Sequence, residues 1–166
     1  MIKLIVLDVD GCLSDGKLIY SHDLIESKNF NVKDGLGITT WIKIGHKVAI
    51  ITGRDSSIVK KRANELGVSY LFQGVRDKKA VLENLMQSLD LQACEVGAIG
   101  DDLNDYDMLQ FVGRSFTPKD GVDEIKKIVN TTLSYNGGDG AVREMINILI
   151  DENNQKNEFL SVWIKD

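Results

Sequence analysis

Short apolar runs rich in β-branched residues alternate along this chain with longer segments whose apolar residues recur at helical spacing. Four runs are predicted as buried strands, because the strands of parallel sheets are apolar along nearly their whole length: residues 3–7, 47–51, 70–72 and 96–99. Helical stripes lie between or after them: Ile58, Val59, Ala63 and Leu66; Leu82, Leu85, Met86 and Leu89; Val142, Met145, Ile146 and Leu149. This alternation predicts a Rossmann-like α/β fold, a parallel sheet flanked by helices.

Length and composition limit the classes of protein to consider. The 166 residues are expected to form one domain, 1–166, and their net charge of -5 argues against a general nucleic-acid or anionic-membrane binder. The apolar run after the N-terminus ends at Asp8, before a signal-peptide core could form, and no stretch approaches the roughly 20 apolar residues of a membrane span. With only two cysteines, Cys12 and Cys94, we expect a cytoplasmic protein whose thiols are small apolar fillers.

Two segments depart from the alternation. Residues 16–30 have the pattern strand, polar turn, strand, which predicts a β-hairpin flap directly after the first core strand. Residues 151–166 form a tail that is polar at first and apolar afterwards. A flap at this place would lie over the carboxyl end of the sheet, where open α/β folds bind ligands.

The strongest polar signals each follow a predicted strand. Asp8 and Asp10 come after the first strand, Thr52 and Arg54 after the second, Lys78 after the third, and the sequence GDDLND, residues 100–105, after the fourth. Because the carboxyl ends of parallel strands meet at one edge, these clusters are expected to converge.

The chemistry of such a cluster favours phosphoryl transfer. Crowded carboxylates without nearby His ligands favour Mg²⁺, which commonly meets its substrate through a phosphate oxygen. Lys78 and the Thr52 hydroxyl are candidates for further phosphate contacts. Asp8 is predicted to attack phosphorus as a carboxylate and form an aspartyl-phosphate, while Asp10 protonates the leaving group and later accepts a proton from water.

The ordered series of an apolar run before DxD, an apolar run before TG, a Lys and GDDxxD resembles the haloacid dehalogenase-like phosphatase superfamily over nearly the whole chain. The segments DVDGCLSDG, ITGRDS, FQGVRDK, GDDLND and GGDGAVRE, with residues 30–35, resemble the 3-deoxy-D-manno-octulosonate 8-phosphate phosphatases, small members with a flap and no large cap. The resemblance implies a Mg²⁺-dependent phosphomonoesterase of lipopolysaccharide sugar biosynthesis and a homotetramer built around the flaps.

The resemblance also implies roles for individual residues. Asp8 is the nucleophile, Asp10 the acid/base, and Lys78 the phosphate-neutralising cation; Asp8, the Asp10 backbone carbonyl and Asp101 bind Mg²⁺. Substrate contacts are expected for these residues: Asp10, Asn31, Val32, Lys33, Asp34, Gly35, Arg54, Arg62 and Lys78. Arginines suit a sugar acid, since a guanidinium grips a carboxylate with two hydrogen bonds.

Two positions bear on the substrate: one differs from the family's usual residue, and the other distinguishes the eight-carbon from the nine-carbon group. Thr39 stands where relatives often have a basic residue, so one expected anion contact is missing. A sister group that acts on nine-carbon keto-sugar acids tends to have Glu after the TG pair, so Arg54 favours the eight-carbon substrate and the nine-carbon ester is the alternative.

Simpler explanations and other classes of function remain open at this stage. Lys78 alone suits a solvated helix start, Arg62 a basic helix surface, and GDDLND a helix cap, which leaves the roles of Asp102 and Asp105 undecided. The tail either packs on its own core or, as in the family, reaches a neighbouring subunit's site. A phospho-receiver signalling module and a silent scaffold homologue are the rival functions; repeated phosphate release would distinguish an enzyme from both.

Overall fold

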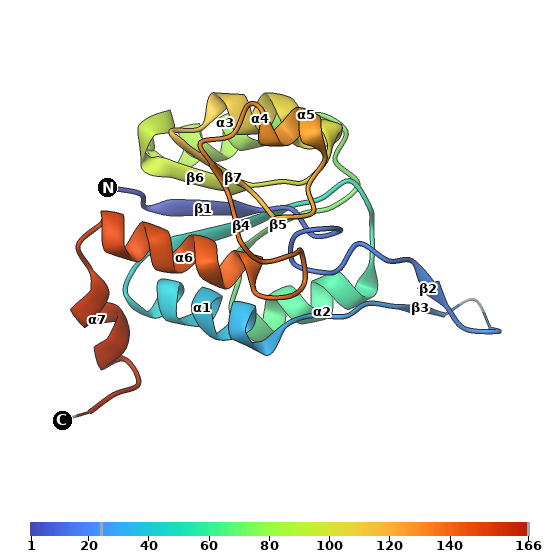
Figure 1. Ribbon diagram of the computed structural model, residues 1–166, viewed down its shortest axis with the longest axis horizontal. Helices are drawn as coiled ribbons and strands as arrows, with labels where there is room; N and C mark the ends of the chain where they lie inside the picture. The colour runs from blue at the N-terminus through green and yellow to red at the C-terminus, as the bar shows by residue number, and fades with distance from the viewer. Residues whose placement is uncertain (24, 166) are drawn as a thin grey trace.

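The computed structural model describes residues 1–23 and 25–165 and places one six-stranded parallel sheet between two layers of helices (Figure 1). The predicted strands are β1 (Leu4–Leu7), β4 (Lys47–Ile51), β5 (Tyr70–Phe72) and β6 (Val96–Ile99). Two strands that the sequence analysis did not predict, β7 (Arg114–Thr117) and β8 (Thr131–Thr132), complete the order β5-β4-β1-β6-β7-β8. The predicted α/β class is confirmed.

Helices cover both faces of the sheet, which is why its central strands are apolar throughout (Figure 1). One layer holds α1 (Val32–Lys43), α2 (Ser57–Leu66) and α6 (Ala141–Glu152); the other holds α3 (Lys78–Leu89), α4 (Tyr106–Phe111) and α5 (Asp123–Lys126). Successive residues of β1 enter opposite cores: Ile5 and Leu7 pack with the α1, α2 and α6 residues, whereas Leu4 and Val6 pack with those of α3 and α4.

Helix α1 was not predicted, because glycines weaken the helical pattern of its sequence. Gly37 nevertheless allows α1 to pack closely on α6, since a Cβ there would lie 3.0 Å from Cδ of Arg143. The side chain of Asn31 caps the helix by accepting a hydrogen bond from the Lys33 backbone N–H at 2.8 Å.

The flap is the antiparallel hairpin of β2 (Ile19–Tyr20) and β3 (Glu26–Ser27), which projects beyond the carboxyl ends of the sheet strands (Figure 1). A β-bridge between Ser14 and Phe30 closes the hairpin at its base. Contacts from this base reach the carboxyl edge, and β2 and β3 extend away from the sheet (Figure 1). In the described ranges no large cap domain covers that edge.

The C-terminal segment packs on the core of its own chain. Helix α7 (Lys156–Ser161) buries Phe159, and the Trp163 indole N–H donates a hydrogen bond to the Thr40 hydroxyl at 2.7 Å. Lys43 places its ammonium 4.1 Å from the centroid of the same indole. Asp166, the last residue of the predicted tail, lies outside the described residues. Over the ranges described, no helix combines the length and the apolar character needed to cross a membrane.

Candidate active site

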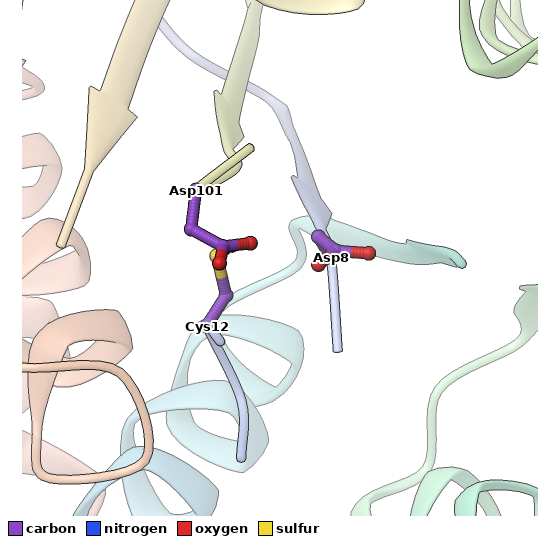
Figure 2. Close-up of side chains that lie close together, drawn as sticks. All are labelled: Asp8, Cys12 and Asp101. Atoms are coloured by element: carbon purple, nitrogen blue, oxygen red, sulfur yellow. Dashed lines mark hydrogen bonds between the residues drawn. The ribbon is translucent and has the colours of Figure 1, made fainter. Parts of the chain in front are cut away.

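The polar clusters predicted from the sequence do meet at the carboxyl edge of the sheet. Asp8 follows β1, Thr52 follows β4, Lys78 begins α3 after β5, and Asp101 follows β6. Side-chain ligand atoms of Asp8, Cys12 and Asp101 lie within 4.8 Å of one another. Figure 2 shows Asp101 directed toward Cys12, with Asp8 beside them at the end of its strand. Their convergence follows directly from the strand order.

Lys78 is buried, in contrast to the simpler expectation of a solvated helix-start lysine. Only 2% of the residue is exposed, and its ammonium donates hydrogen bonds to Asp8 Oδ1 at 2.7 Å and Asp105 Oδ1 at 2.6 Å. Burial acts to lower the pKa of Lys78, but the two carboxylates outweigh it, and the pKa is raised. The lysine is therefore a permanent cation beside Asp8.

Asp105, whose role the sequence left open, organises this part of the site. It is fully buried, and its second oxygen, Oδ2, accepts the backbone N–H groups of Asp101 at 3.1 Å and Asp102 at 3.5 Å. The side chain of Asp102 also caps the short 3₁₀ helix η2 (Leu103–Asp105). The GDDLND segment thus forms a cap and, through Asp105, also holds Lys78 and the backbone of Asp101.

Negative charge exceeds positive charge in this cluster, which is the condition that a divalent cation relieves. Burial, together with the neighbouring charge of Asp105, raises the pKa of Asp8 to about 8 and that of Asp101 to about 7. Burial also raises the pKa of the Cys12 thiol, so it stays neutral and the remaining donors are oxygens. An oxygen donor set with excess negative charge fits Mg²⁺.

Gly11 allows this close arrangement. Its backbone has φ +100, and a Cβ at this position would lie 2.0 Å from Asp101 Oδ2. Gly137 approaches from the other side, where a Cβ would lie 1.7 Å from the Gly11 carbonyl oxygen. The glycines of DVDGC and GGDG therefore let two loops touch beside the carboxylates.

A second group of charges surrounds the Asp10 carboxylate, and sequence reasoning missed half of it. Lys28 on the flap donates a hydrogen bond to Asp10 Oδ1 and lies 3.3 Å from Glu26 Oε1. Arg54 completes a ring, with Nε 3.8 Å from Asp10 Oδ2 and Nη2 3.0 Å from Glu26 Oε1. Glu26 also accepts the Ser56 hydroxyl at 2.8 Å. The two-residue spacing of Glu26 and Lys28, which places both on one side of a strand, was the available signal.

The other predicted substrate residues lie around the N-terminus of α1. Val32 is 79% exposed and Lys33 is exposed, whereas Asp34 is buried and accepts the Arg143 backbone N–H at 2.8 Å. A Cβ on Gly35 would lie 2.4 Å from Nη2 of Arg62. Arg62 pairs with Glu65 at 3.4 Å. No hydrogen bond or ion pair within the described chain joins Asn31–Gly35 or Arg62 to Asp8, Asp10 or Lys78. Their substrate contacts stay a prediction.

A cavity of about 310 Å³ opens beside Lys78 and is also lined by Arg76 and Asn104. A larger cavity, about 500 Å³, lies at the opposite edge of the sheet, around His46 and Lys47. None of the acidic residues that follow β1 and β6 lines it. The 500 Å³ cavity is therefore not part of the carboxylate cluster at the carboxyl edge.

Comparisons with known proteins agree with this geometry. Residues 71–146 match the model of the haloacid dehalogenase-like hydrolase family. A 3-deoxy-D-manno-octulosonate 8-phosphate phosphatase from Haemophilus influenzae is 35% identical over 158 residues, which cover 95% of this chain and 88% of the relative.

Solved structures are similar over the same extent. The phosphatase of that name from Moraxella catarrhalis, in complex with a magnesium ion, a phosphate ion and a KDO molecule, has a TM-score of 0.94 and 37% identity. The match covers 98% of this chain and 94% of that one. A cobalt-bound form of the Haemophilus influenzae enzyme has a TM-score of 0.89 and 35% identity, over 99% of this chain and 94% of the other.

Proposed function

We infer the reaction from family membership: the chain belongs to the haloacid dehalogenase-like hydrolases and, among them, to the 3-deoxy-D-manno-octulosonate 8-phosphate phosphatases. It is a Mg²⁺-dependent phosphomonoesterase that converts 3-deoxy-D-manno-octulosonate 8-phosphate to the free sugar acid and phosphate, for lipopolysaccharide sugar biosynthesis. The observation that carries this function is the buried Lys78 joined to Asp8 and Asp105 at the sheet edge, opposite Asp101.

The first step transfers the phosphoryl group to the enzyme. Asp8 attacks phosphorus, so that a bond forms from its carboxylate oxygen to phosphorus while the bond from phosphorus to the sugar oxygen breaks. Asp10 gives its proton to that sugar oxygen, and the sugar leaves as an alcohol. Lys78 fixes the Asp8 carboxylate through Oδ1 and places a positive charge beside the incoming phosphate.

The second step returns the enzyme to its starting state. A water molecule attacks phosphorus and gives a proton to Asp10, the bond between phosphorus and Asp8 breaks, and phosphate leaves. Asp8 is again a carboxylate and Asp10 again carries the proton. The Thr52 side chain, after β4 and next to Arg54, is assigned to a phosphate oxygen in both steps.

The side chains of Asp8 and Asp101 and the backbone carbonyl of Asp10 would hold the magnesium ion. When bound, the ion offsets the negative charge that the carboxylates and the phosphate bring together. The closeness of the Asp8 and Asp101 carboxylates, which also lie close to Cys12, supports this assignment.

We assign recognition of the sugar's carboxylate to Arg54. Arg54 lies at the rim with 42% of its side chain exposed, and its fork suits the carboxylate of the sugar. Asn31, Val32, Lys33, Asp34, Gly35 and Arg62 are proposed to take part in substrate binding. Val32 and Lys33 are exposed, and we propose that they reach a sugar bound in the site of a neighbouring copy.

A substrate panel tests the function. We expect the purified protein with Mg²⁺ to release phosphate repeatedly, with kcat/KM highest for the eight-carbon ester among eight- and nine-carbon keto-acid phosphates. A preference for the nine-carbon ester would contradict the substrate, and a single phosphorylation without turnover would contradict the enzyme. An Asp8→Asn variant serves as the control and should form no acyl-linked phosphate.

We propose a homotetramer that assembles through the flaps. Its support is an exposed apolar surface on the flap, formed by Leu18, Ile19, Tyr20 and Ile25, which are 40–65% exposed. Light scattering of the parent and of an Ile25→Glu variant tests this, with the variant expected to dissociate. A cytoplasmic location also stays a prediction, and the two free cysteines are consistent with it.

A further inference from the structure

Lys28 lies on the flap, yet its side chain is buried at the site, and the steps above do not use it. Only 1% of the Lys28 side chain is exposed, whereas Lys17, another flap lysine, has 75% of its side chain in solvent. Burying an ammonium group is costly unless it is paired and hydrogen-bonded. Its pairing partners therefore explain why the flap turns this residue inward.

The partner that matters for chemistry is Asp10. Lys28 Nζ donates a hydrogen bond to Asp10 Oδ1 and is held in place by Glu26, whose Oε1 lies 3.3 Å away. Throughout residues 1–23 and 25–165, no other group donates a hydrogen bond to the Asp10 carboxylate. The nearest further cation, Arg54, has Nε at 3.8 Å from Oδ2, which is beyond hydrogen-bonding distance.

Lys28 and Arg54 differ in how firmly they are held. Arg54 is 42% exposed and is assigned to the substrate carboxylate, so substrate binding draws it away from Asp10 and Glu26. Lys28 is buried and contacts both Asp10 and Glu26 directly, so neither of these contacts involves Arg54. The orientation of Asp10 during the reaction then depends on the flap lysine alone.

We propose that Lys28 is the positioning residue that holds the Asp10 carboxyl toward the leaving oxygen of the substrate, so that the flap completes the acid/base machinery. The inference rests on the proposed function, in which Asp10 protonates the sugar oxygen. It assigns Lys28 no contact with the reacting atoms. Glu26, in β3, supports Lys28 through its carboxylate, whose Oε1 lies 3.3 Å from Lys28 Nζ.

Two substrates with different leaving groups distinguish a role of Lys28 in positioning Asp10 from a general structural role of Lys28. An alkyl phosphate needs a proton on its leaving oxygen, whereas p-nitrophenolate leaves without one. We expect Lys28→Met to lower kcat for the sugar phosphate about 10- to 100-fold, a part of the about 10²- to 10⁴-fold that acid/base catalysis contributes. KM should change less than about threefold, since the variant keeps Arg54 and Lys78.

The first turnover with p-nitrophenyl phosphate provides the comparison. The burst of p-nitrophenolate in a rapid-mixing experiment should keep its parental rate within about threefold in Lys28→Met, because forming the aspartyl-phosphate from this ester needs no acid. Lys28→Arg should recover most of the sugar phosphate rate, since it keeps a cation at this place. Lys17→Met, on the same flap, is the matched control and should behave as the parent.

Three kinetic results would overturn the inference: an unchanged kcat for the sugar phosphate, equal losses on both esters, or no recovery with Lys28→Arg. A parent protein that rejects the sugar phosphate contradicts the proposed substrate instead, and any accepted alkyl phosphate then replaces it in the comparison. Crystal structures of the parent and Lys28→Met test the geometry without any activity. The Asp10 carboxylate should lose its single orientation in the variant, and an unchanged orientation would refute the proposal.

Discussion

The free energy of unfolding of an Asp34→Asn variant should rise relative to that of the parent when the pH changes from acidic to alkaline. Asp34 is 1% exposed, and its Oδ1 accepts the Arg143 backbone N–H at 2.8 Å. Its Oδ2 is buried without a hydrogen-bond partner in the described part of the chain. Burial is the main cause that raises the pKa of Asp34 from 3.8 to about 6.

The sign of the effect follows from proton binding. A carboxyl with a raised pKa in the folded state binds its proton more tightly there than in the unfolded chain. The parent therefore loses stability as the pH rises from about 4 through about 6, and the loss persists above that. The difference between pKa 3.8 and about 6 corresponds to about 3 kcal/mol, which relaxation of the ionised state reduces to about 1–3 kcal/mol.

Urea unfolding of Asp34→Asn and the parent, followed by tryptophan fluorescence at pH 4 and pH 8, measures this. Asparagine keeps an oxygen for the Arg143 N–H, so any fixed cost of the substitution is the same at both pH values and cancels in the comparison. We expect the variant to gain about 1–3 kcal/mol relative to the parent between pH 4 and pH 8. Asp151→Asn, at an exposed side chain, is the control, and an equal pH dependence in Asp34→Asn and the parent would refute the reasoning.

Further predictions concern the site. Lys78→Met leaves Asp8 and Asp105 without their cation. The free energy of unfolding should therefore fall by about 3–5 kcal/mol, and the rate of phosphate release should fall at least about 100-fold. Parental stability in urea would contradict this. Arg54→Ala should lower kcat/KM far more for the sugar acid phosphate than for p-nitrophenyl phosphate, and equal losses would remove its role. Chelation with EDTA should lower turnover at least about 100-fold and added Mg²⁺ should restore it, whereas turnover that survives chelation would contradict a metal requirement.

The central strands and the convergence of the motifs were predictable because each rests on a local pattern. An apolar run followed by a carboxylate predicts both a buried strand and a polar group at its end, as at Leu7 and Asp8. The short strands β7 and β8 were not predicted, since Arg114 and Thr131 interrupt or replace the apolar run. A core strand without a continuous apolar run gives no clear signal in a single sequence.

The burial of charged side chains was harder to predict than their position. Lys78 was placed from the order of the motifs, but its exposure of 2% depends on Asp105, which η2 brings under it from another part of the chain. Nothing in the sequence around Lys28 or Asp34 indicates burial. Lys28 is buried against Asp10, and Asp34 is buried against the backbone of Arg143 in α6. Such contacts join residues distant in the sequence, and no local period encodes them.

The charges of the site fall into two groups with different consequences. Around Lys78, the three carboxylates of Asp8, Asp101 and Asp105 outnumber the one cation, so this inner group requires a further positive charge before a phosphate dianion can enter.

The outer ring pairs two carboxyl groups, Asp10 and Glu26, with two cations, Lys28 and Arg54. A carboxylate that binds Arg54 must therefore compete with Glu26, a flap residue. An ester without a carboxylate leaves that ring intact. We propose that the sheet edge supplies the chemistry common to phosphate esters, and that Glu26 and Lys28 on the flap link binding of the sugar's acid group at Arg54 to the acid/base step.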